Sequence, residues 1–103
     1  MNKRAYSLDE TLRRLAAGEV VPVDADDFAG WSAAFTLVDT VRSAMGGDKQ
    51  LLRWTPPGAR KLGWLLVEEP DPGLLAVRPL KTEKEARALI AERLAAYERM
   101  WDG

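Results

Sequence analysis

The sequence contains no cysteine and no histidine. Without cysteine no disulfide can form, and without either residue the usual ligand sets for zinc, copper and haem are missing. Only a metal held by oxygen ligands remains open. The same absences remove the commonest nucleophilic and acid–base side chains of enzymes. We therefore expect a protein that is not an enzyme and that uses no cofactor.

The sequence also lacks any run approaching the roughly 20 apolar residues of a membrane-spanning helix. Its N-terminus has charges but not the apolar core of a signal peptide. These patterns predict a cytoplasmic protein without a membrane partner. A length of 103 residues with 47% hydrophobic and 30% charged residues is typical of one folded domain. We expect a single domain over residues 1–103, in which residues 1–6 form a flexible arm unless Tyr6 packs on the helix that follows.

The most hydrophobic extended segment, Lys61 to Leu80, has the pattern of a β-hairpin. Two apolar runs flank a cluster of turn residues from Glu68 to Gly73. A loop formed by Pro70 to Gly73 pairs Val67 with Ala76. In that register one face of the sheet carries Leu62, Trp64, Leu66, Leu75 and Val77, and the other carries Leu65, Val67, Leu74 and Ala76.

A third strand is predicted before the hairpin, from Lys49 to Thr55. The link from Pro56 to Arg60 holds two prolines and a glycine, so it is not helical. The first hairpin strand is apolar on both faces and should therefore be central. Pro79 lacks an amide hydrogen, which places the second hairpin strand at a sheet edge. The three strands form an antiparallel meander.

Two segments carry the capping-box pattern of a helix start. Ser7 and Glu10 precede a short helix that ends at Gly18, while Thr82 and Glu85 precede a helix that runs to the end of the sequence. The apolar spacing of this last helix is regular, and its natural place is on the sheet face with the hairpin tryptophan. We expect one peripheral and one long, sheet-covering helix.

A second helix is predicted to begin at Asp24, which is a good N-cap. Apolar residues recur at spacings of three and four from Phe28 to Met45, so this helix should continue to the glycine pair that follows. Gly30 either lets another backbone approach the helix closely or indicates that the helix starts one turn later. The preceding segment, Glu19 to Val23, is extended and could add a short edge strand.

Together these elements predict an α+β fold in the order helix, helix, three-stranded antiparallel meander, helix, with the helices packed on the sheet. The last helix should pack on Trp64 and Leu66. Helix capping explains the acidic residues Asp24, Asp26 and Asp27 better than a metal site does, because the spacing of a calcium-binding loop is missing.

The middle of the chain is locally basic, since no acidic residue lies between Lys49 and Lys61. Trp54 stands beside a basic residue and the diproline link, a neighbourhood that tolerates partial exposure. It is therefore the aromatic residue that we expect to anchor a partner. The candidate partner-binding residues are Arg53, Trp54, Arg60, Lys61 and Arg78.

Three functions are compatible with these residues. The first is a non-enzymatic protein–protein interaction or regulatory protein, similar to an inhibitor or adaptor, whose partner the sequence does not identify. The alternative is a small nucleic-acid-binding module with basic side chains on phosphates and Trp54 stacked on a base, although the net charge of −1 weighs against it. The third is a ligand-binding subunit or a small enzyme with a carboxylate-based pocket, for which no motif is visible.

A homodimer is expected because the predicted helices do not cover both faces of the sheet. The two long predicted helices both pack on the face with Trp64, which leaves only the short first helix for the other face. A symmetric pair of chains would bury the remainder. The candidate dimer contact consists of Leu65, Val67, Leu74 and Ala76, with the alanine-rich side of the last helix as the alternative.

Overall fold

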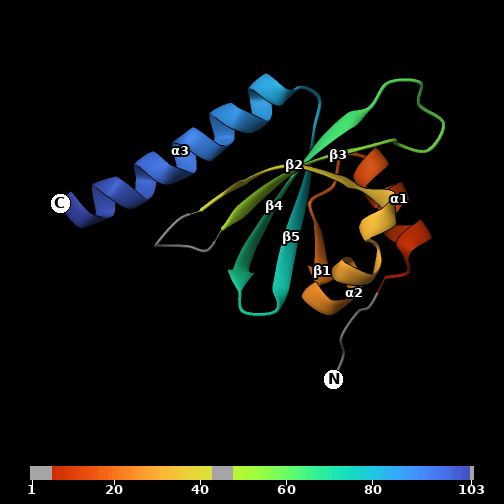
Figure 1. Cartoon of the computed structure of the whole chain (residues 1–103), viewed down its shortest axis with the longest axis horizontal. Helices are drawn as coiled ribbons and strands as arrows, with labels where there is room; N and C mark the ends of the chain where they lie inside the picture. The colour runs from red at the N-terminus through yellow and green to blue at the C-terminus, as the bar shows by residue number, and fades with distance from the viewer. Residues whose placement is uncertain (1–5, 43–47, 103) are drawn as a thin grey trace.

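The computed structural model describes residues 6–42 and 48–102, with side chains described up to residue 96. These residues form a five-stranded antiparallel sheet with helices on both faces (Figure 1). The strands are β1 (Val21–Asp24), β2 (Thr36–Val41), β3 (Lys49–Trp54), β4 (Gly63–Asp71) and β5 (Leu74–Leu80), in the spatial order β1-β5-β4-β3-β2. The helices are α1 (Leu8–Ala16), α2 (Ala25–Gly30), the short 3-10 helix η1 (Ser32–Ala34) and α3 (Glu83–Asp102). The predicted α+β class and the central meander, β3 to β5, are confirmed.

The hairpin between β4 and β5 forms, but its register differs by one residue from the predicted one. Val67 lies opposite Val77 rather than Ala76, and Asp71 lies opposite Leu74. The turn is therefore tighter than four residues, and a bulge after Glu68 absorbs the extra residue of β4. Because side chains alternate along a strand, a shift of one residue exchanges the faces of β5 relative to β4.

The strand β5 is not an edge strand, which corrects the prediction from Pro79. β1 pairs with β5 from Val21 opposite Val77 to Asp24 opposite Leu74. This pairing ends before Pro79, so the missing amide hydrogen of Pro79 interrupts no bond to β1. The extended segment before α2 thus becomes an edge strand, as the sequence allowed.

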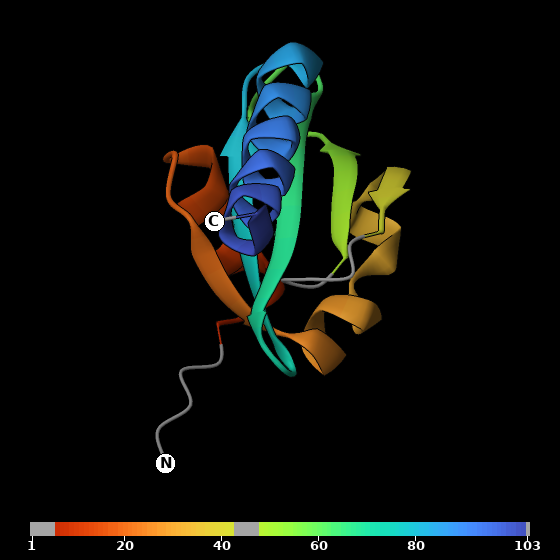
Figure 2. The same cartoon turned by 90° about the vertical axis from the view of Figure 1, so that its left-hand side faces the viewer.

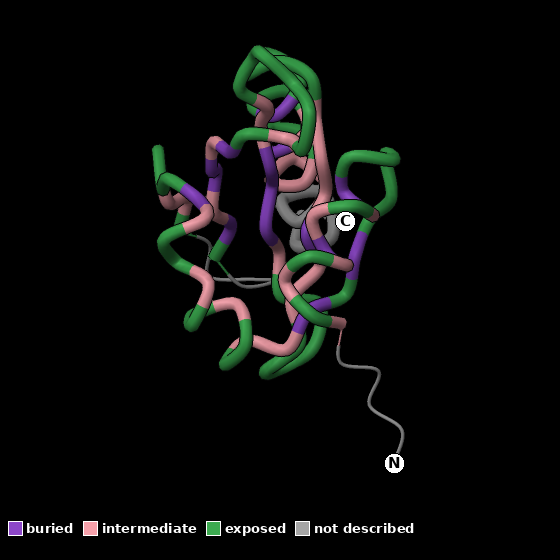
Figure 3. Tube along the Cα trace, turned by 90° about the vertical axis from the view of Figure 1, so that its right-hand side faces the viewer, coloured by how far each residue is buried: buried purple, intermediate pink, exposed green. Residues whose placement is uncertain are grey.

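One face of the sheet, which we call the α1 face, carries the main hydrophobic core. The buried residues there are Val21, Val23, Leu52, Trp54, Leu65, Val67 and Val77, packed with Leu15 of α1 and with Phe35. Figure 3 shows this burial along the strands, with exposed positions on the loops and outer helix surfaces. Tyr6 also packs on this core, with the Arg14 guanidinium 4.3 Å from the centre of its ring. The rest of the predicted N-terminal arm lies outside the described residues.

The opposite face, which we call the α3 face, carries the long helix. α3 contacts β4 and β5, as Figure 2 shows from the helix side, with β1 and β2 at opposite edges of the sheet. Leu51 and Leu66 are completely buried on this face, and Ala86 and Ile90 are the buried positions of α3. Packing of the last helix on the face with Trp64 and Leu66 is therefore confirmed.

The predicted second helix is much shorter than expected. Asp24 caps α2 as predicted, since its carboxylate accepts a hydrogen bond of 2.9 Å from the Asp26 backbone N–H. The helix ends at Gly30, however, and after η1 the chain enters β2. β2 is rich in threonine and valine, whose branched side chains favour strands over helices. The final residues of the predicted helix lie outside the described residues.

The four residues of the predicted dimer contact do not form one surface. Leu65 and Val67 are buried on the α1 face, whereas Leu74 and Ala76 lie on the α3 face because of the shifted register. The reason for the error is that α1, α2 and η1 lie on one face and α3 on the other, so neither face lacks a helical layer. The surface expected for a homodimer is therefore not present on the sheet.

Candidate functional site

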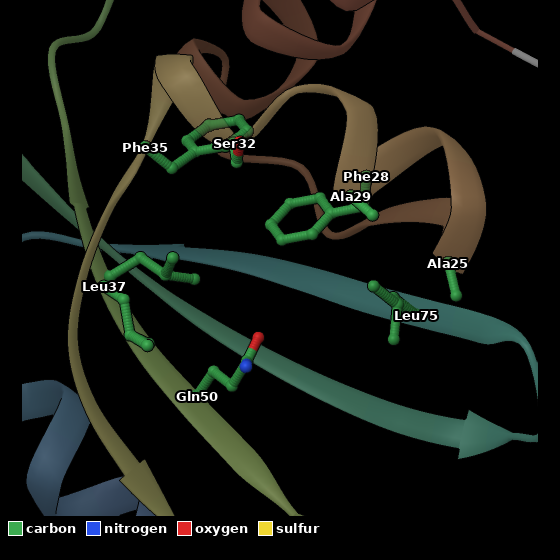
Figure 4. A pocket seen from close by; sticks show the side chains of 9 residues that line it. Ala25, Phe28, Ala29, Ser32, Phe35, Leu37, Gln50 and Leu75 are labelled. Carbon is green, nitrogen blue, oxygen red and sulfur yellow. The ribbon is translucent and has the colours of Figure 1, made fainter.

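An apolar cavity of about 410 Å³ lies between α2, η1 and the sheet. Figure 4 shows the side chains that line it, and we call it the α2 groove. Its walls are formed by Ala25, Phe28, Ala29, Ser32, Phe35, Leu37, Gln50, Leu52 and Leu75. Within this lining only Ser32 and Gln50 carry polar side-chain groups. The groove can therefore take an apolar group and offer it one hydroxyl and one amide.

The groove is formed where the chain passes from α2 through η1 to β2. The ring of Phe28 stacks on that of Phe35, with 5.1 Å between the ring centres and 13° between their planes. This stack links the end of α2 to the start of β2 and holds the short helices above the sheet. Leu37 follows on β2 and lines the groove, although 54% of its surface is exposed. The groove is therefore continuous with the outer edge of the sheet.

The two edges of the sheet differ in their capacity to pair with another strand. β1 has four residues, one of which is Pro22, and proline donates no backbone hydrogen bond. β2 has six residues and no proline, and it exposes both Leu37 and Val38. A bulge interrupts its pairing with β3 near Leu37, but pairing is regular from Asp39 to Val41. Within the described part of the chain β2 is thus the open edge, and it borders the α2 groove.

The predicted partner-binding residues are divided between the two faces. Arg53 and Arg78 lie on the α3 face and are half-buried, while Arg60 and Lys61 are exposed in the connection between β3 and β4. The guanidinium carbon of Arg53 lies 4.7 Å from the centre of the Trp64 ring. The structure therefore brings the two arginines to the same face as Trp64.

Trp54 is not the exposed aromatic residue that we expected. It is only 4% exposed, because it points into the core of the α1 face. Its indole lies directly over Gly63, where a Cβ atom would come within 2.7 Å of the indole Nε1. Trp64, opposite Arg53 in the register, takes the place predicted for Trp54 beside a basic residue. Only the cross-strand register identifies Trp64, which is why sequence reasoning missed it.

The ion pairs on the α3 face hold α3 on the sheet. The carboxylate of Glu68 lies 3.5 Å from Lys49 Nζ and accepts a hydrogen bond of 3.0 Å from Arg93. Arg87 donates hydrogen bonds of 2.9 Å to Asp39 and to Glu83, and these bonds raise its pKa above the ordinary arginine value. These charges are paired within the fold and offer little to a partner.

The described residues show neither a metal site nor a membrane span. Among the described side chains, in residues 6–42 and 48–96, no three acidic groups gather as ligands for a metal ion. No helix within these ranges is long and apolar enough to cross a membrane. Comparison of the chain with protein-family models, with curated proteins and with solved structures finds no match. The function must therefore be argued from the sites themselves.

Proposed function

We propose that this protein is a non-enzymatic protein–protein interaction module of a regulatory or adaptor kind. It binds an extended segment of a partner protein along β2, with an apolar side chain of that segment in the α2 groove. The observation that carries this proposal is the open edge of β2 beside an apolar cavity of about 410 Å³.

The unpaired edge determines the shape of the partner segment. An edge strand presents a row of free backbone N–H and C=O groups, which an extended peptide can pair with. β2 offers six residues for this purpose, whereas Pro22 weakens the opposite edge at β1. A partner strand is therefore expected at β2 and not at β1.

The groove determines the chemistry of the segment. Main-chain bonds to an edge strand are independent of sequence, so specificity must come from side chains that enter a pocket. The aromatic and aliphatic walls of the α2 groove favour a large apolar side chain, for which Leu37 forms the rim. Gln50 and Ser32 can hydrogen-bond the backbone of the segment at the same place.

The experiment is a selection from a displayed library of random short peptides against the purified full chain. We expect selected peptides to carry a bulky apolar residue and to shift the backbone amide NMR signals of β2 and Gln50. Leu37→Glu should lower their affinity by about tenfold or more, because it places a charge at the rim of an apolar pocket. Leu62→Glu is the matched control, since Leu62 is 47% exposed and lies outside the groove.

Two results would contradict the proposal. One is that the selected peptides bind Leu37→Glu as well as they bind the original chain, or shift amides away from β2. The other is a dimer, detected by sedimentation equilibrium, that Leu37→Glu dissociates. In that case a second copy of the chain, and not a different protein, occupies the edge.

A further inference from the structure

The basic side chains that the structure describes fall into two groups. Six of them form ion pairs with carboxylates, namely Arg13, Arg14, Arg42, Lys49, Arg87 and Arg93. The other six form none with the residues described, and they are Arg53, Arg60, Lys61, Arg78, Lys81 and Lys84. All of this second group lies on or next to the ends of β3 and β5, the start of β4 and the start of α3. We call this region the basic end.

The basic end is a single region of the fold. In Figure 1 the connection between β3 and β4 and the beginning of α3 lie at the same upper end of the sheet. Trp64 pairs with Arg53 on one side and with Leu80 on the other, and α3 begins three residues after Leu80. Charges that are separated by up to 31 positions in the sequence are thus brought to one end.

Two of these side chains, those of Arg53 and Arg78, are partly desolvated, and their buried Nε atoms have no hydrogen-bond acceptor among the described residues. A buried charged donor without an acceptor is unfavourable, so such a group usually has a partner in the working state of a protein. The ordinary partner of an arginine in this condition is an oxyanion.

The two arginines lie on the α3 face, on strands at either side of β4. Arg53 lies on β3 opposite Trp64, and Arg78 lies on β5 opposite Leu66, so the two flank β4 on one face. The contact of its guanidinium with the Trp64 ring helps to orient Arg53, which gives Trp64 a positioning role.

The carboxylates of Glu83 and Glu85, which are close to Lys81 and Lys84 in the sequence, do not neutralise the basic end. Glu83 accepts a hydrogen bond of 2.9 Å from Arg87. Glu85 accepts one of 3.1 Å from the backbone N–H of Lys81 and so serves as part of the helix cap. The remaining charge of the basic end is therefore positive, although the whole chain has a net charge of −1.

We propose that the basic end binds phosphate, with Arg53 and Arg78 as the residues that contact the phosphate oxygens. A phosphate group carries up to two negative charges and several acceptor oxygens, whereas a carboxylate carries one charge. Several uncompensated cations around two buried arginine donors match the phosphate better. The phosphate belongs either to a small phosphate compound or to the backbone of a single-stranded nucleic acid, which share this chemistry.

The test is a titration of the full chain with two probes at low ionic strength. Binding is measured by isothermal calorimetry and by the NMR signals of the tryptophan indoles. The probes are inorganic tripolyphosphate and a short single-stranded oligonucleotide. The double variant Arg53→Gln with Arg78→Gln should lose at least about tenfold in affinity for whichever probe binds. The control is Arg13→Gln with Arg42→Gln, which removes the same charge from two exposed, ion-paired arginines and should change affinity less than about twofold.

A conservative variant distinguishes specific contacts with phosphate from nonspecific attraction to positive charge. Arg53→Lys keeps the charge but loses the planar guanidinium, so it should lower affinity severalfold if the fork contacts phosphate oxygens. Circular dichroism checks that each variant is folded. Phosphate should raise the melting temperature of the original chain, and the double variant should lose this rise.

The source of the phosphate follows from the two probes. Binding of tripolyphosphate alone identifies a small phosphate compound, and tighter binding of the oligonucleotide with a steep dependence on salt identifies a nucleic-acid backbone. Both outcomes support the proposal. It is overturned if neither probe binds at millimolar concentration, or if the double variant and its charge-matched control lose affinity equally.

Discussion

At the scale of single residues, Gly63 is the position where the smallest change should have a large effect. It lies at the start of β4 beneath the indole of Trp54, and Pro56 packs against the same site. Trp54 is buried in the core, where side chains are closely packed, so its ring can move only by displacing neighbours. The absence of a side chain at Gly63 is what lets the ring lie in the core.

Gly63→Ala is therefore expected to destabilise the protein by about 1 to 3 kcal/mol, because the added methyl group overpacks this contact. Gly30→Ala is the control, since a Cβ atom there meets nothing within 4 Å and its φ angle is not positive. This second variant should be neutral or more stable by up to about 1 kcal/mol. Urea denaturation measures both, and an equal effect of the two substitutions would disprove the packing argument.

At the scale of elements, the three predicted helix starts all form with their expected caps. The hydroxyl of Ser7 accepts a hydrogen bond from the Glu10 N–H at 3.1 Å, and that of Thr82 accepts one from the Glu85 N–H at the same distance. Asp24 caps α2 in the same manner. Each cap satisfies a backbone donor that the first turn of a helix leaves free.

Thr82→Ala should cost about 1 kcal/mol, because α3 loses its cap while the rest of the helix is unchanged. Thr82→Ser keeps a hydroxyl at the same place and should recover most of the loss. Thermal unfolding of the three proteins, monitored by circular dichroism, is the measurement. A serine variant as unstable as the alanine variant would show that the methyl group, and not the cap, is responsible.

At the scale of the whole molecule, three elements meet at one buried charge. Lys49 on β3 is 1% exposed, and Glu68 on β4 lies between it and Arg93 on α3. A carboxylate stabilises a buried ammonium group, because removing that charge from water is costly. The pairing therefore joins the sheet to the long helix.

Glu68→Gln should destabilise the protein by about 3 kcal/mol, since it leaves the Lys49 ammonium and the Arg93 guanidinium without this carboxylate. Glu10→Gln makes the same chemical change in α1, where Glu10 pairs with Arg13 and Arg14 at the surface, and should cost much less. Guanidinium chloride is unsuitable because it screens charge, so urea denaturation is the measurement. Similar losses for both variants would contradict the role of the buried pairing.

Sequence alone determined the features that depend on nearby residues. The caps at Ser7, Asp24 and Thr82, the hairpin and its apolar strands, and the long last helix all follow from hydrogen bonds or periodicities within a few positions. These features could be predicted because a short segment contains all of their causes.

Only the tertiary structure decided the features that depend on the register between strands and on which helix packs on which face of the sheet. The bulge after Glu68 moved β5 by one residue, which placed Ala76 away from Leu65 and removed the expected dimer surface. The apolar spacing from Phe28 onward predicted a helix, but the pairing of β2 with β3 makes Thr36–Val41 a strand with a bulge between Leu37 and Asp39. Trp54 is buried because β4 places a glycine beneath it. In each case the deciding contact joins residues far apart in the chain, and local propensity contains no information about it.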